Sequence, residues 1–217
     1  SKLKCYLEQE GLYIFTLNGF PYGTFHGKPI KEEVYQPDWR YSERLIYTNL
    51  LADILAKILP GDVNTGSIST VPGAFKEKIT SQNEIELMAR TMAKHVAHLV
   101  RIERNTGRLI KTALEPEPCC YLETIDEAIL FYKDYLLSNS VIDQLATDCG
   151  LNRSNSERAV RRHLGICLDL CHAAVEFENA ELCIKSLTDS GIELPKIQLS
   201  SGLRIPNVTH KTAKSLE

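Results

Sequence analysis

The sequence predicts an α/β fold, namely a segment of a (β/α)8 TIM barrel with about five βα units. Five short apolar runs follow one another along the chain, and each gap between them carries helical periodicity. Such alternation predicts parallel strands joined by crossover helices. Polar residues come just after the strands, where a barrel places its active site. A flavodoxin-like open sheet is the alternative, although no G-x-G-x-x-G turn follows the first run.

The predicted strands are apolar or β-branched runs that end in turns or polar residues. They cover 12–17, 66–70, 109–114, 166–170 and 196–199. The first, Leu12 to Leu17, has the composition of a strand that is buried on both faces. Glycine and proline break the pattern at 19–23, so a loop follows.

Helices are predicted from apolar spacing and from capping signals. Ser81 with Glu84 and Thr124 with Glu127 form capping boxes. The expected helices cover 45–58, 82–105, 125–137, a short segment ending at Gly150, a segment capped by Ser154, and 179–190. We treat 1–217 as one domain.

The composition of the chain limits which partners and which cellular compartment are expected for the protein. The 217 residues are 43% hydrophobic and 24% charged with a net charge of −3, and the basic residues are scattered, so we expect no nucleic-acid partner. No apolar stretch approaches the length of a membrane span, so we expect no membrane insertion. Seven cysteines, an odd count with one adjacent pair, indicate a reduced cytoplasmic protein. A homodimer is left open.

The most specific motif is Asp169 followed three residues later by His172, at the end of the fourth strand. If the strand breaks at Asp169, both side chains can point into one cavity. A carboxylate and an imidazole together suit Mn²⁺, Mg²⁺ or Zn²⁺. The alternative is that Asp169 caps the following turn and His172 packs beneath it. Cys167 and Cys171 lack partners at zinc-site spacing, so we expect core thiols.

A second candidate is the acidic pair Glu115 and Glu117 after the third strand. Pro116 stops the ladder and fixes the backbone, which holds a carboxylate at the rim. Because side chains alternate, only one of the pair faces inward cleanly, and we favour Glu115. A solvated acidic turn is the alternative.

The loop after the first strand offers residues for sugar recognition, in which apolar faces stack and polar edges form hydrogen bonds. Asn18, Tyr22 and His26 belong to it, and Trp39 is expected to close over it. Ser69, after the second strand, is a weaker candidate. The alternative is a structured loop whose aromatic residues plug the barrel mouth.

These motifs resemble the xylose isomerase-like superfamily, which includes sugar phosphate isomerases, sugar epimerases and the endonuclease IV group. The Asp-x-x-His strand at 166–174 carries this resemblance. The chain is more closely similar to EboE-type metabolite traffic proteins. That likeness rests on Phe-Thr-Leu-Asn-Gly-Phe-Pro-Tyr-Gly, Asp-Trp-Arg, Leu-Glu-Pro-Glu-Pro, Cys-His-Ala-Ala-Val-Glu-Phe-Glu and Lys-Ile-Gln-Leu-Ser, which follow in order from 15 to 200.

The resemblance implies roles for particular residues. Glu115 and Asp169 would be metal ligands, and His172 would contact substrate or metal. Gln198 would stand at a position where the superfamily usually has a histidine ligand, and an amide oxygen is a poorer ligand. The resemblance also implies that the first two strands and the last strand of the barrel, with its catalytic glutamate, lie outside this sequence.

Three functions follow from these observations. The first is a metal-dependent isomerase or epimerase of a carbohydrate-like metabolite, with Glu115 and His172 as catalytic residues. The second is a non-catalytic protein that binds and hands over such a metabolite. Glu117 is expected among the ligand contacts. The third, an endonuclease, is disfavoured because it needs further histidines and a basic groove.

Overall fold

The computed structural model describes residues 2–23 and 31–214. Its elements, in chain order, are α1 Lys2–Gln9, β1 Thr16–Asn18, η1 Lys31–Tyr35, α2 Ser42–Ile58, β2 Thr65–Thr70, η2 Lys76–Lys78, α3 Gln82–Thr106, β3 Leu109–Leu114, α4 Ile125–Phe131, η3 Tyr132–Leu136, α5 Asn139–Cys149, α6 Arg153–His163, β4 Leu164–Asp169, α7 Leu170–Val175, α8 Ala180–Asp189, β5 Lys196–Gln198 and α9 His210–Lys214. The prediction of five strands with helical segments in every gap is confirmed.

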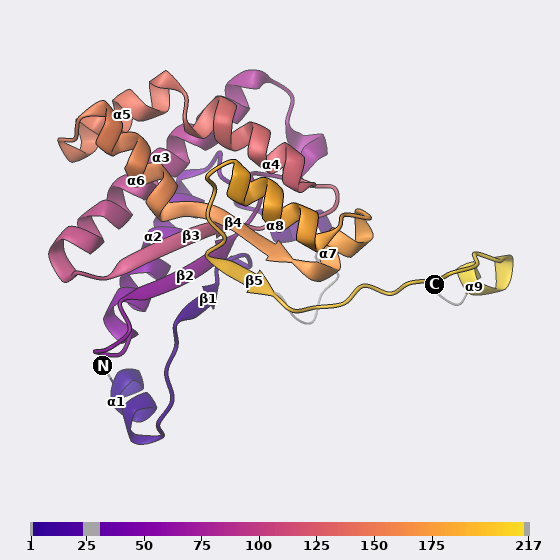
Figure 1. Ribbon diagram of the computed structural model, residues 1–217, viewed down its shortest axis with the longest axis horizontal. Helices are drawn as coiled ribbons and strands as arrows, with labels where there is room; N and C mark the ends of the chain where they lie inside the picture. The colour runs from indigo at the N-terminus through magenta and orange to yellow at the C-terminus, as the bar shows by residue number, and fades with distance from the viewer. Residues whose placement is uncertain (1, 24–30, 215–217) are drawn as a thin grey trace.

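The five strands form one parallel sheet in the order β1-β2-β3-β4-β5 (Figure 1). Each strand therefore pairs with its neighbours in sequence, and the order never reverses. A flavodoxin-like sheet has its first two strands exchanged and is excluded by this order. The α/β fold with barrel-type strand order is confirmed.

The helices pack against one face of the sheet, because that face carries the apolar side chains. Ile68, Ile110 and Leu114 point to it from β2 and β3, and they join clusters with buried residues of α2 and α3. Ile166 and Leu168 of β4 extend the same core toward α4, α5, α6 and α8. In Figure 1 these helices gather on one side of the strands.

The opposite face is polar and lies on the inside of a curved sheet. In a flat sheet of five strands the edge strands β1 and β5 would be about 19 Å apart, at about 4.8 Å per strand. Instead the ammonium group of Lys196 on β5 lies 3.4 Å from the Leu17 carbonyl of β1 and 3.4 Å from the Ser69 hydroxyl of β2. The sheet therefore curls around its polar face like part of a barrel.

The helix boundaries follow local signals in most places. Both predicted capping boxes are present, at Ser81 with Glu84 and at Thr124 with Glu127. The predicted cap at Ser154 is wrong: Asn152 caps α6, because its side-chain oxygen accepts a hydrogen bond from the Asn155 amide at 2.8 Å. Within the described ranges, no helix combines the length and apolar character needed to cross a membrane.

The prediction of a first strand over 12–17, buried on both faces, is wrong in its extent. Only Thr16–Asn18 is a strand, and Leu12, Tyr13 and Phe15 are all more than half exposed. The reason is that β1 lies at the edge of this sheet and pairs only with β2, along three residues. The apolar run lacks the second neighbour that would bury it.

A buried histidine joins two helices to the sheet. His95 on α3 is fully buried, and its Nδ1 lies 2.6 Å from the Asn49 side-chain oxygen of α2. Its Nε2 lies 2.8 Å from the Thr112 hydroxyl of β3. The amide oxygen can only accept, so Nδ1 carries the proton and Nε2 accepts from Thr112. Burial, with the nearby His98 and His163, lowers the pKa of His95 to about 3.

This depressed pKa predicts a loss of stability in acid. Because the unfolded chain protonates His95 near pH 6.5 and the folded chain does so only near pH 3, stability is complete above pH 6.5 and falls below it. One such proton costs up to about 1.4 kcal/mol per pH unit. We expect His95→Gln, which cannot charge, to flatten the fall in unfolding free energy from pH 6.5 to about 4, as measured by urea denaturation. His210→Gln, at an exposed position of α9, should keep the wild-type slope; parallel slopes for His95→Gln and wild type would contradict this role.

Candidate active site

Three strand ends bring their polar side chains to one place on the inner face of the sheet. Glu115 comes directly after β3 and is only 7% exposed. Its backbone amide donates a hydrogen bond to the Thr70 carbonyl at 3.1 Å. Asp169 is the last residue of β4, and Gln198 is the last residue of β5. The register pairs Asp169 with Gln198 directly. Parallel strands thus deliver all three residues to the same edge.

The side-chain amide of Gln198 links the two carboxylates. Its Nε2 donates to Glu115 Oε1 at 2.6 Å and to Asp169 Oδ2 at 2.7 Å. Both amide protons are therefore used, and the two carboxylate oxygens converge on one nitrogen. This is the position that a cation would take between two acidic groups.

Asp169 is a strand end and a helix cap at the same time. Its Oδ1 accepts from the Cys171 amide at 2.9 Å, which starts the short helix α7, and it also accepts from the Ser200 hydroxyl. Burial alone would raise the pKa of Asp169. The hydrogen bonds from Ser200 and Cys171, together with His172, outweigh this effect and lower the pKa below its usual value. The capping interpretation is therefore correct for Oδ1, while Oδ2 faces Gln198.

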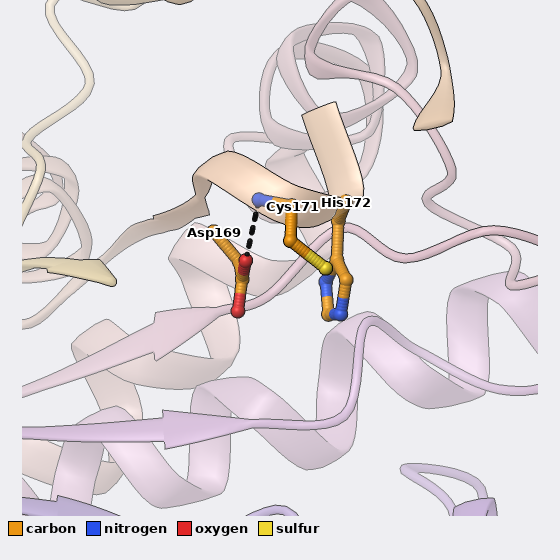
Figure 2. A group of neighbouring side chains, drawn as sticks. All are labelled: Asp169, Cys171 and His172. Atoms are coloured by element: carbon orange, nitrogen blue, oxygen red, sulfur yellow. Dashed lines mark hydrogen bonds between the residues drawn. The ribbon is translucent and has the colours of Figure 1, made fainter. Parts of the chain in front are cut away.

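His172 lies beside this carboxylate. Its Nδ1 donates to the Pro116 carbonyl at 3.1 Å, because a carbonyl can only accept, so the lone pair of the neutral ring is on Nε2. Figure 2 shows Asp169, Cys171 and His172 projecting to the same side of the turn between β4 and α7. One ligand atom from each lies within 4.8 Å of the others, so this group could hold a metal ion.

Glu117 is a partly buried carboxylate near the same site. Its Oε1 accepts a hydrogen bond from the Tyr35 hydroxyl at 3.0 Å. Burial raises the pKa of Glu117, and the charges of Glu115 and Asp169 act in the same direction, while His172 and the Tyr35 hydrogen bond oppose them. The pKa of Glu117 therefore depends on the charges of the residues at the strand ends.

Asn18 and Ser69 lie on the same polar face, nearer the β1 edge. The register pairs them with each other, and Lys196 of β5 donates hydrogen bonds to both. Lys196 and Gln198 are two residues apart on one strand, so they share this face. The inner face thus carries a continuous row of polar groups from Asn18 to Asp169.

Three residues that were predicted to contact substrate lie elsewhere or cannot be placed. Trp39 is completely buried, and its ring packs at 5.8 Å from that of His95, so it belongs to the core. Tyr22 packs edge-on against Tyr47 at 5.1 Å on a half-exposed surface. His26 is outside the described residues.

Comparison with known proteins adds a distant structural likeness. No protein-family description and no curated protein matches the chain. Among solved structures, the chain is similar to the apo form of YcjR, 3-keto-D-glucoside 4-epimerase, from E. coli. The two are 14% identical with a TM-score of 0.44, and the match covers 99% of this chain and 81% of that chain. A likeness of this size carries no argument about activity, and the fold assignment rests on the strand order.

The site contains residues that were not predicted for it. Cys171 was expected to be a core thiol, and this is wrong: it is partly exposed, whereas Cys167 is buried as expected. Ser200 and Lys196 flank Gln198 at a spacing of two, so strand alternation could have placed all three on one face. Tyr35 comes from η1, and no spacing in the sequence links it to Glu117.

The residues at the strand ends fit a divalent cation. Glu115 and Asp169 offer hard carboxylate oxygens that already converge, and the Gln198 amide can present its oxygen by turning over. His172 offers a nitrogen donor beside Asp169, in a group with Cys171 that does not include Glu115. Such a set suits Mn²⁺, Mg²⁺ or Zn²⁺.

The double hydrogen bond of Gln198 gives a prediction for the metal-free protein. We expect Gln198→Ala to lower the unfolding free energy by about 1 kcal/mol in the presence of a chelator, because two partly buried carboxylates lose a donor. Gln144→Ala is the matched control, since this amide makes one long contact of 3.4 Å on the surface. Denaturant titration measures both variants. An unfolding free energy of Gln198→Ala equal to that of wild type would show that the Gln198 amide does not join the two carboxylates in solution.

Proposed function

We propose that this chain is part of an isomerase- or epimerase-like barrel that uses a divalent metal to act on a small carbohydrate-like metabolite. The observation that carries the proposal is the convergence of Glu115, Asp169 and Gln198, from three successive strand ends, with His172 beside them. The sugar class comes from the resemblance of these motifs to the xylose isomerase-like superfamily, with the EboE-type metabolite traffic proteins as the nearer likeness.

Each residue has a proposed task. Glu115 and Asp169 hold the ion, with Gln198 and His172 as further donors. When bound, the ion stabilises the negative charge that builds up on a carbonyl oxygen as the neighbouring C–H proton is removed. His172 is fixed by its bond to the Pro116 carbonyl, so its Nε2 can orient a hydroxyl or carry a proton.

The remaining polar groups of the inner face suit a polyhydroxylated ligand. On the inner face, Asn18, Ser69 and Lys196 lie on one side of the strand-end residues. Glu117 lies toward the other side. Their amide, hydroxyl, ammonium and carboxylate groups offer both donors and acceptors, as hydroxyl recognition requires. We propose that they contact the hydroxyls of the metabolite.

A second function, non-catalytic binding and hand-over of a metabolite, is favoured by the Gln198 amide. Its nitrogen already satisfies both carboxylates, so the chain can keep this arrangement with no ion bound. An imidazole at this position would bind metal more tightly than an amide. Loss of metal-dependent catalysis with retention of the pocket would produce such a site.

The first test is metal content. We expect the purified protein to take up about one divalent ion per chain, and Asp169→Asn to lose most of it, because the amide has lost the charge that the ion needs. Asp143→Asn removes an acidic group that is 65% exposed and serves as the matched control. Elemental analysis after dialysis measures all three proteins, and equal metal content in wild type and Asp169→Asn would contradict the proposed site.

Exchange of the substrate proton then separates the two functions. Ketoses and their phosphates are incubated with metal-loaded protein in D₂O, and deuterium at the carbon next to the carbonyl is followed by NMR. Exchange that Asp169→Asn abolishes supports the isomerase or epimerase. Sugar binding without exchange supports the hand-over protein, and the absence of both contradicts the carbohydrate assignment.

A further inference from the structure

Cys171 places a thiol at the edge of the proposed metal site. It follows Asp169 by two residues and precedes His172, and one ligand atom from each of the three residues lies within 4.8 Å of the others. Among the described cysteines, Cys120, Cys149, Cys167 and Cys183 are buried, and Cys5 and Cys119 are exposed. Cys171 alone in this set lies close to both an imidazole and a carboxylate that the site uses.

The local fold fixes all three side chains on one side of a single turn (Figure 2). Asp169 Oδ1 accepts from the Cys171 amide, so the capping bond that starts α7 also sets the direction of the following side chains. His172 donates through Nδ1 to the Pro116 carbonyl, and a metal-binding histidine commonly has its second nitrogen held in this way. Its Nε2 therefore has a free lone pair.

The donor types distinguish between metals. Sulfur and imidazole nitrogen are soft or borderline ligands that favour Zn²⁺, whereas Mg²⁺ and Mn²⁺ favour oxygen. Three protein ligands drawn from cysteine, histidine and carboxylate side chains, with one position open, are the usual pattern of a catalytic zinc site. The ligand atoms of tetrahedral zinc lie about 3 to 4 Å apart, and one ligand atom from each of the three side chains lies within 4.8 Å of the others.

We propose that Cys171 is a zinc ligand, together with Asp169 and His172, and that it makes the site select Zn²⁺ over Mn²⁺ and Mg²⁺. The inference rests on the proposed function, because it assigns the metal of that same site. This assignment replaces Glu115 and Gln198 as ligands of the ion, because Glu115 is not in the group of side chains whose ligand atoms converge. Glu115 and Gln198 would instead line the open side of the ion, where a metabolite would bind. Zinc binding converts the Cys171 thiol to a thiolate, and its proton leaves to solvent.

Cobalt substitution tests this directly, because Co²⁺ replaces Zn²⁺ and shows a thiolate-to-metal charge-transfer band in the near ultraviolet only when sulfur is a ligand. The whole chain, free of metal, is titrated with Co²⁺, and the bound Co²⁺ is then displaced with Zn²⁺. We expect the band in wild type and its loss in Cys171→Ser. We also expect Cys171→Ser to weaken Zn²⁺ binding by at least the roughly tenfold that the loss of an outer-shell partner costs.

Two controls make the outcomes separable. Cys5→Ser changes an exposed thiol of α1 and should keep both the band and the Zn²⁺ affinity. Mn²⁺ affinity, followed by its paramagnetic resonance signal, should be nearly the same in Cys171→Ser and wild type, which also shows that the variant is folded. Co²⁺ binding without the band, or a band that survives in Cys171→Ser, would overturn the zinc-ligand proposal and leave the metal site in place. If neither Co²⁺ nor Mn²⁺ binds to wild type, the proposed function fails as well.

Discussion

The close approach of the chain before β5 to Gly165 of β4 is the constraint on which the candidate site depends. A Cβ atom at residue 165 would lie 2.4 Å from the Glu193 carbonyl oxygen and 2.6 Å from Pro195 Cδ, so no side chain fits there. The Glu193 carbonyl accepts from the Ile166 amide at 3.0 Å, and this bond leads into the pairing of β5 with β4. That pairing brings Gln198 against Asp169. A shift of β5 would therefore separate the third strand end from the other two.

Local chemistry explains how much of the fold the sequence could predict. Capping boxes, apolar spacing and terminal glycines act within one or two turns, so they indicated α2, α3 and α4 and the strands between them. Convergence of Glu115, Asp169 and Gln198 was also predictable, since parallel strands in sequential order have their carboxyl ends at one edge. What the sequence could not supply is which oxygen faces which partner. Asp169 serves as cap and as site residue with different oxygens.

Contacts between distant segments explain what sequence reasoning missed. The apolar segment 12–17 would be buried only if a strand lay on each side of it. In this structure β1 pairs with β2 alone. Trp39 was predicted to contact substrate because of its position near the loop after the first strand. In the structure it packs against His95, which lies on α3. Cys171 was expected to be a core thiol because it lacks partner cysteines at zinc-site spacing, whereas the helix that starts after Asp169 places it beside His172. In each case the deciding partner is remote in the chain or belongs to a short, unpredicted element.

The central claim is that the strand ends around Asp169 form a metal site, and anomalous diffraction tests it most directly. Crystals of the protein are soaked with Mn²⁺ or Zn²⁺, and data are collected at the absorption edge of each metal. The account predicts an anomalous peak within coordination distance of Asp169, with His172 and Glu115 or Cys171 around it. Peaks that appear only at exposed carboxylates, with none beside Asp169, would contradict it.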